Sequence, residues 1–138
     1  PTDTAETLYE RLFRKGAELL HQNINKYINP DLIGIKSETK HTPQDHSQAT
    51  FTKHLTRLNG YIDINNPPSK EIIDRMVRAY YPWPGAWSKL MIKDKGLRIK
   101  FLPNKRIQVE GGKPMTYKDF LNGYPEARQW LETVLLEE

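Results

Sequence analysis

The sequence changes character at the ten residues Arg78–Trp87, which read RAYYPWPGAW. Apolar residues recur at helical spacing before this stretch and alternate with polar residues after it. Pro82 ends the helix, because a proline disfavours the helical conformation of the residue before it. Pro84 and Gly85 then reverse the chain into the strand AWSKLMI. We predict a helix-to-strand corner whose structural residues are Arg78, Pro82, Trp83, Pro84, Gly85 and Trp87. Trp83 and Trp87 are expected to fill this corner rather than to stack on bases.

Three helices are predicted upstream of the corner. Residues 3–28 have a long apolar stripe at helical spacing and an Asp3–Glu6 pair typical of a capping box. That stripe requires a packing partner. Residues 49–60 place Phe51, Leu55 and Leu58 at i, i+4 and i+7, which predicts a short helix. Residues 70–81 form a third helix capped by Ser69. The polar, proline-containing residues 29–48 are interpreted as an extended connector.

Downstream of the corner, the period of two predicts a meander of three short strands at residues 86–92, 97–102 and 106–109. Arg98 and Lys100 alternate with apolar neighbours, so one face should be apolar and the other basic. Thr116 with Asp119 is expected to cap a further helical turn. A last helix should begin at Pro125, with Trp130, Leu131, Val134 and Leu135 on one side. The predicted class is α+β: a long N-terminal helix and linker, then a small antiparallel sheet flanked by helices.

The positive charge is concentrated in one segment of the chain. Residues 86–118 contain nine basic and two acidic side chains, a net charge of +7, whereas the whole chain carries +4. Such a local excess indicates a polyanion partner, although a solvated lysine-rich face that protects a small sheet stays open as an alternative. The candidate nucleic-acid-binding residues of this segment are Lys89, Lys93, Lys95, Arg98, Lys100, Lys105, Arg106 and Lys113.

Several classes of site lack support in the sequence. There is no cysteine, so disulfides and thiolate metal sites are excluded. His41, Asp45 and His46 lie close together in the connector, but a metal site there would lack a fourth ligand. No phosphate-binding glycine loop, nucleophile elbow or HExxH motif occurs, and we predict no catalytic residue and no metal. Without a membrane-spanning run or a signal-peptide pattern, a cytoplasmic location and no membrane partner are expected.

Four stretches carry a family resemblance. DTAETLYERLFRKGAELL resembles the last helix of the catalytic domain of methionyl-tRNA formyltransferases. ATFTKHLTRLNGYID, EIIDRMVRAYYPWPGAW and GGKPMTYKDFLNG resemble, in that order, the C-terminal region of the same family. The resemblance implies an accessory region similar to an open oligonucleotide-binding barrel, which holds initiator tRNA through a basic surface. By position, it also places Lys53 and Arg57 in a basic stretch that faces tRNA. The family usually has a longer run of strands between PWPGAW and GGKPM, so Trp130 in the last helix is expected to cover a sheet edge left open by the missing strands.

The catalytic domain of that family binds 10-formyltetrahydrofolate and uses an Asn, a His and an Asp, and none of these motifs is found in this chain. The resemblance therefore implies a portion without cofactor or catalysis of its own, with a catalytic domain in cis or in trans. The domains implied are 1–28, the end of the catalytic domain; 29–48, a linker; and 49–138, a tRNA-binding domain with a reduced sheet.

A second interpretation stays open beside this one. Sugar N-formyltransferases and related folate-dependent enzymes carry C-terminal regions that shape oligomers or the rim of the active site. In that case the stripes of the first and last helices would be buried against another chain.

Overall fold

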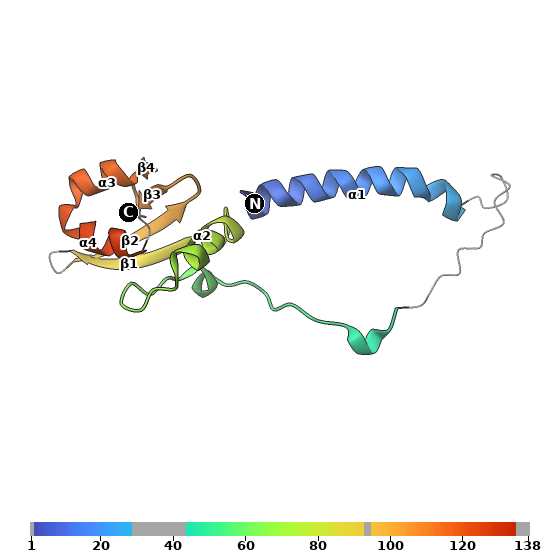
Figure 1. The fold of residues 1–138 in the computed structure, drawn as a ribbon, viewed down its shortest axis with the longest axis horizontal. Coiled ribbons are helices and arrows are strands. Elements are labelled where there is room, and N and C mark those ends of the chain that lie inside the picture. Colours follow the sequence, from blue (N-terminus) through green and yellow to red (C-terminus); the bar gives the residue numbers. More distant parts are fainter. Residues whose placement is uncertain (1, 29–43, 93–94, 135–138) are drawn as a thin grey trace. The chain divides into compact units, whose positions relative to one another are not determined.

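The computed structural model describes residues 2–28, 44–92 and 95–134. The chain divides into two compact units, one of residues 8–54 and one of residues 1–7 together with 55–138. An N-terminal helix is followed by a four-stranded antiparallel open sheet with flanking helices, so the predicted α+β class is confirmed (Figure 1). Of the connector expected at residues 29–48, residues 29–43 lie outside the described residues, and residues 44–48 contain a short 3₁₀ helix, η2 (His46–Gln48).

The first helix is α1 (Ala5–Ile28), as the apolar spacing predicts. Its cap differs from the expected pair. The Thr7 amide donates to the hydroxyl of Thr4 over 3.2 Å, and the Thr4 amide donates to the hydroxyl of Thr7 over 3.0 Å. Thr4 therefore caps the helix in place of Asp3, because a residue directly before the first turn can reach the free amides there. The leucines of the apolar stripe are exposed.

The sheet is a meander in the order β1, β2, β3, β4, with every neighbouring pair antiparallel. The sequence predicts the first three strands and misses the fourth. Two residues are too few to show a period, and β4 exists only because it pairs with the start of β3. The strands are β1 (Ala86–Ile92), β2 (Lys95–Leu102), β3 (Arg106–Val109) and β4 (Met115–Thr116).

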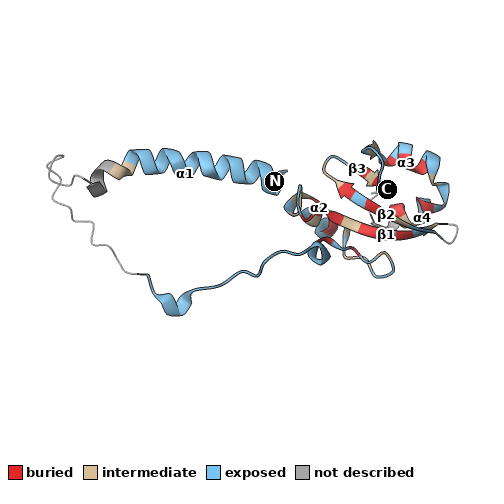
Figure 2. Ribbon diagram, turned by 180° about the vertical axis from the view of Figure 1, so that it is seen from behind, coloured by how far each residue is buried: buried red, intermediate tan, exposed pale blue. Residues whose placement is uncertain are grey.

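The register of β1 and β2 decides what each face of the sheet carries. Trp87 lies opposite Lys100, and Ser88 lies opposite Ile99. Successive side chains of a strand point to opposite faces, so Trp87 and Lys100 share one face while Ser88 and Ile99 share the other. Ser88 and Ile99 are fully buried, whereas Lys100 is exposed. The predicted sheet with one apolar and one basic face is confirmed by this register and by the burial of the strand residues. Figure 2 shows the buried and less buried positions along the strands.

A buried cluster joins the apolar face of the sheet to the helices of the same unit. Each fully buried isoleucine in it stabilises the fold by about 1.5–3 kcal/mol. The cluster draws residues from the segment before α2, from α2 itself, from three strands and from the helices after the sheet. Its members are Ile62, Ile73, Val77, Ala86, Leu90, Ile99, Phe101, Ile107, Val109, Tyr117, Phe120, Leu121, Ala127 and Leu131.

The helix predicted at residues 49–60 does not form. Residues 49–56 have no regular secondary structure, and only η3 (Arg57–Gly60), a short 3₁₀ helix, follows them. The amide of Thr56 donates to the side-chain oxygen of Asn59 over 2.6 Å, which starts the helix there. Phe51 and Leu58 are both exposed. The apolar side chains at this spacing are therefore not packed against another element. Because most helical stability in proteins comes from packing an apolar face, a longer helix is not stabilised here.

The corner joins α2 (Lys70–Ala79) to β1. The helix ends two residues earlier than predicted, and residues 80–84 form turns. The Gly85 amide donates to the Tyr80 carbonyl over 2.9 Å, and Gly85 has a φ of 79°, in the left-handed region that favours glycine. Both prolines of the corner follow cis peptide bonds. Arg78 is paired with Asp74 over 2.9 Å at the C-terminal end of the helix.

Short helices complete the fold after β4. They are α3 (Tyr117–Gly123), η4 (Pro125–Ala127) and α4 (Arg128–Val134). The cap of α3 is confirmed, since the Asp119 amide donates to the hydroxyl of Thr116 over 3.1 Å. The expected role of Trp130 is wrong. Its ring centroid lies 5.8 Å from that of Phe101 in β2, an inner strand, so α4 packs on the apolar face and not over an open edge.

Candidate functional site

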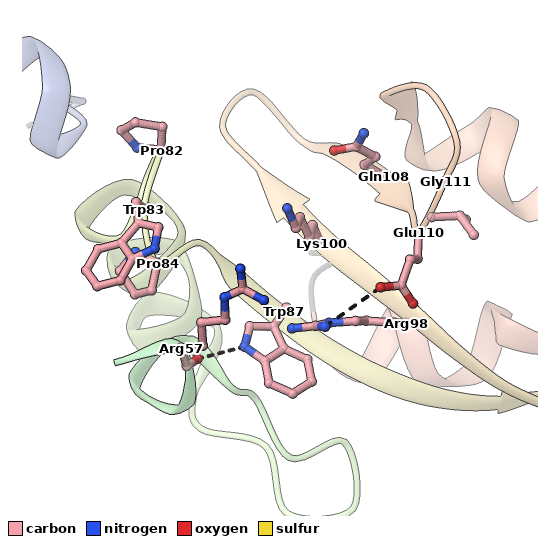
Figure 3. A pocket seen from close by; sticks show the side chains of 11 residues that line it. Arg57, Pro82, Trp83, Pro84, Trp87, Arg98, Lys100, Gln108, Glu110 and Gly111 are labelled. Carbon is pink, nitrogen blue, oxygen red and sulfur yellow. Dashed lines mark hydrogen bonds and ion pairs between the residues drawn. The ribbon is translucent and has the colours of Figure 1, made fainter. Parts of the chain in front are cut away.

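The polar face of the sheet and the corner together line a hollow of about 240 Å³ (Figure 3). Three cations, two tryptophans and a single carboxylate lie around it. Figure 3 shows Trp83 and Pro82 on one side, Lys100 and Gln108 on the other, and Arg57 between them. The lining residues are Arg57, Pro82, Trp83, Pro84, Trp87, Arg98, Lys100, Gln108, Val109, Glu110 and Gly111.

Trp87 and Arg98 form a fixed base for the hollow. The indole nitrogen of Trp87 donates to the Arg57 carbonyl over 2.8 Å, and the Tyr61 ring lies 4.9 Å from the Trp87 ring between centroids. The guanidinium carbon of Arg98 lies 4.2 Å from the centroid of the Trp87 ring, a cation–π contact. These contacts hold Trp87 in place, and they leave little of its ring free for a ligand.

Arg98 is oriented by further partners. One terminal nitrogen lies 3.8 Å from a carboxylate oxygen of Glu110, whose amide donates to the Arg98 carbonyl over 2.9 Å. The Arg98 Nε is buried and has no hydrogen-bond partner within the described residues. The side chain is 31% exposed, so part of the guanidinium still reaches solvent. Arg98 is therefore a cation ordered before any ligand arrives, and Glu110 offsets its charge.

Arg57 and Lys100 supply the uncompensated charge. Both side chains are exposed, and neither has a carboxylate partner within the part of the chain that the structure describes. Three cations and one carboxylate give the lining a net charge of +2. Arg57 comes from η3, which is held beside the sheet by the bond from Trp87. The hollow is thus suited to an anion, because two of its cations keep their full electrostatic attraction for a ligand.

Trp83 departs from its expected role. Its side chain is 57% exposed, so it does not fill the corner as predicted. Pro84 is buried in its place, and the indole stands at the rim of the hollow. The sequence alone does not distinguish the two tryptophans, since they stand at the two ends of the same short segment, residues 84–86. Their difference comes from the turn, which directs one ring onto Tyr61 and Arg98 and the other to solvent.

The remaining predicted cations fall into three groups. Lys89 and Arg106 share the polar face with Lys100, and Arg106 donates to the Pro114 carbonyl over 3.1 Å. Lys95, Lys105 and Lys113 are exposed at strand ends and loops, away from the hollow's lining. Lys53 belongs to the other compact unit, and Lys93 lies outside the described residues.

We call the surface formed by Trp87, Lys89, Arg98, Lys100 and Arg106 the basic face. Gln108 and Glu110 belong to the hollow and were missed by sequence reasoning. Along β3, Gln108 stands between the apolar residues Ile107 and Val109, both buried. This alternation could have indicated that Gln108 lies on the polar face of the sheet. Within the described residues, no three side chains are arranged to bind a metal ion; His41 is outside them. None of the described helices has the length and apolar character needed to cross a membrane.

The fold and the site define a class: a small open sheet with an apolar face covered by helices and a basic face suited to an extended anion. The chain is homologous to methionyl-tRNA formyltransferases. It is 44% identical over 88 residues to that of Chloroflexus aurantiacus, an alignment that covers 64% of this chain and 26% of the relative. It is 38% identical over 103 residues to that of Roseiflexus castenholzii, covering 72% and 30%. With that of Koribacter versatilis it is 29% identical over 151 aligned positions, covering 90% and 46%.

The chain therefore spans between about a quarter and under half the length of these relatives. No family model matches the chain. No solved structure gives a significant match.

Proposed function

We propose that this chain forms the C-terminal, tRNA-binding part of a methionyl-tRNA formyltransferase. In this proposal the basic face holds initiator tRNA, while a catalytic domain outside these residues transfers the formyl group from 10-formyltetrahydrofolate. The proposed domains are the end of the catalytic domain at 1–28, a linker at 29–48 and the tRNA-binding part at 49–138. A cytoplasmic location belongs to the same proposal.

One observation carries the proposal most directly. Arg57 and Lys100 are exposed, lack carboxylate partners within the described residues, and lie beside the ordered guanidinium of Arg98. Neutralising phosphates and releasing their counterions supplies most of the affinity of proteins for nucleic acid. The basic face extends this charge along three strands through Lys89 and Arg106. Together with the homology, this arrangement favours RNA over the alternative of a merely solvated face.

The hollow does not fit a folate site of the kind that the resemblance implies. Such a site brings together an Asn, a His and an Asp, and the lining of the hollow contains none of these residue types. Its volume of about 240 Å³ also lies below the range of about 300–1,000 Å³ typical of pockets for drug-sized ligands. The hollow therefore lacks the groups that the resemblance assigns to formyl transfer.

The test is binding of the full chain to tRNA over a range of salt concentrations, measured by fluorescence anisotropy with labelled tRNA. The double variant Lys89→Gln/Lys100→Gln should weaken binding. If each lysine neutralises one phosphate, it should also flatten the slope of log K against log salt by about 1.8. Arg98 and Arg106 are poorer choices for this test, because their contacts to Trp87, Glu110 and Pro114 also support the fold.

The control is the double variant Lys15→Gln/Lys118→Gln, which removes the same charge from the helices α1 and α3. It should leave the slope unchanged, because neither lysine lies on the basic face. Salt-insensitive binding by the wild-type chain, or an equal change of slope in both variants, would rule out the basic face as the tRNA surface.

A second candidate function is supported by one observation on α1. Its leucines at 8, 12, 19 and 20 are exposed, and an apolar stripe of this kind is typical of a surface that contacts another protein segment. Under this alternative the chain is an interaction module of a folate-dependent formyltransferase. Light scattering would then find a stable oligomer, and the chain would show no affinity for tRNA.

A further inference from the structure

The indole of Trp83 is an exposed aromatic surface that projects from a turn with a constrained backbone. Its side chain is 57% exposed at the rim of the hollow. The peptide bonds on both sides of the residue lead to or from a proline, and the bond from the Gly85 amide to the Tyr80 carbonyl, 2.9 Å, closes the turn around it. Because this turn already fixes the backbone from which the ring projects, a ligand that binds there does not have to order the backbone. Exposing a large apolar ring beside a charged hollow brings no benefit to folding, because burial is what stabilises an aromatic ring.

Trp83 and Trp87 differ in what they can offer to a ligand. One tryptophan is already engaged: the ring of Trp87 has the Arg98 guanidinium at 4.2 Å and the Tyr61 ring at 4.9 Å. For Trp83, no ring or cation contact exists within the described residues. Trp83 is therefore the aromatic ring of the hollow that a planar ligand can reach.

The charge around the hollow restricts the chemistry of that ligand. Arg57 and Lys100, both without a carboxylate partner in the described chain, line the same hollow as Trp83. A ligand that both stacks on the Trp83 ring and neutralises these two cations has a planar ring with an anionic group next to it. That is the chemistry of a nucleotide. Every base has a face that stacks on an aromatic side chain, whatever its identity. Bases inside a duplex are already stacked on each other, so a base that reaches Trp83 must be unpaired.

We propose that the hollow binds one unpaired nucleotide of the RNA, with its base stacked on Trp83 and a neighbouring phosphate held by Arg57 and Lys100. The inference rests on the proposed function, since it names the part of the RNA that one region of the basic face recognises. Stacking on Trp83 adds a preference for unpaired RNA, which charge alone does not produce. Paired regions would contact the lysines through phosphates, whereas a loop or a strand end would also bind at Trp83.

The experiment compares the full chain with the variants Trp83→Ala and Trp83→Phe. The probes are a labelled twelve-nucleotide uridine strand and a labelled RNA duplex of equal length, and binding is followed by anisotropy. Trp83→Ala should lower the affinity for the single strand about fivefold or more, the loss expected for one stacked base. The affinity for the duplex and the salt slope with both probes should stay unchanged. Trp83→Phe should retain most of the affinity, because a phenyl ring also stacks.

Tryptophan fluorescence gives an independent measurement. The uridine strand should quench the emission of the wild-type chain, and Trp83→Phe should remove most of that quenching. The matched control is Trp130→Phe, whose ring packs against Phe101 on the opposite, apolar side of the sheet and which should keep the quenching. Circular dichroism of each variant establishes that the fold is intact, as expected for an exposed side chain.

The outcomes separate the inference from the function on which it rests. Salt-sensitive binding to the duplex and to tRNA, with Trp83→Ala equal to wild type on the single strand, would overturn the stacking site and leave the proposed function standing. Absence of salt-sensitive binding to every RNA would overturn both. Equal competition by polyglutamate and by the uridine strand would also overturn the inference, because charge alone would then explain binding.

Discussion

Gly60 is the position where adding a single methyl group should damage the fold most selectively. A Cβ built on Gly60 would overlap the carbonyl oxygen of Gly85 and lie 2.9 Å from its carbonyl carbon. Carbon atoms pack at about 3.5–4.0 Å, so Gly60→Ala must push the two backbone segments apart by about 0.6–1.1 Å at the least. Both partners are backbone atoms, which cannot move aside as the end of a flexible side chain can.

The displacement acts on the contacts that join this segment to β1. The Ile62 amide donates to the Trp87 carbonyl over 2.8 Å, and the buried Ser88 hydroxyl donates to the Ile62 carbonyl over 2.6 Å. Overpacking of this kind costs about 1–3 kcal/mol. Losing one of the hydrogen bonds adds about 1 kcal/mol. We therefore expect Gly60→Ala to lower the free energy of unfolding by about 2–4 kcal/mol, a large part of the 5–15 kcal/mol typical of a domain.

Urea unfolding followed by tryptophan fluorescence measures this change, because all three tryptophans lie in the unit that contains residues 55–138. With a typical slope for a small domain, the midpoint should fall by about 1–2 M. Gly123→Ala is the matched control: Gly123 ends α3, and a Cβ there would meet nothing within 4 Å. That variant should stay within about 0.5 kcal/mol of wild type. If Gly60→Ala also did so, the close approach to Gly85 would be refuted.

Two further predictions concern buried polar groups on the apolar side. Burial, with a smaller contribution from the charge of Asp74, raises the pKa of Tyr117 to about 12 from 10. The unfolded chain loses the phenolic proton first, so the free energy of unfolding should fall by about 2 kcal/mol as the pH rises from 10 to 12. Tyr117→Phe should remove this part of the pH dependence, and an unchanged alkaline slope in that variant would contradict the assignment. Ser88→Ala should lower the free energy of unfolding, measured in urea, by about 1–3 kcal/mol, because the Ile62 carbonyl loses its buried donor. Ser47→Ala, at an exposed position, serves as the control. Equal stabilities of the two variants would argue against the bond between Ser88 and Ile62.

Local patterns in the sequence predict much of the sheet and part of the site. The alternation around Arg98 and Lys100 is enough to predict one basic and one apolar face, since each residue of a strand points opposite to its neighbours. The same alternation predicts that Lys89 and Arg106 are cations of a surface. These positions depend only on the period of a strand and on two short turns, so a reader of the sequence can find them.

The pattern at residues 49–60 shows where such reasoning fails. Phe51 and Leu58 have helical spacing but no buried surface to contact, and the side chains of Thr56 and Asn59 favour a short 3₁₀ turn instead. The spacing of a segment reports which of its side chains could share a face. It does not report whether another element lies against that face, and without one a short helix has too little to stabilise it.

The sequence by itself determined the class of the fold, the position of the corner and the sign of the charge on the sheet, because each follows from neighbours within about ten residues. The tertiary structure decided what the hollow contains. It brought Arg57 next to Trp87, thirty residues later, through the bond to the Arg57 carbonyl and the close approach of Gly60 to Gly85. It also turned Trp83 to solvent while Trp87 packed under Arg98. These outcomes depend on which distant segments bury each other, and that is settled by the free energy of the whole packed unit and not by any local pattern.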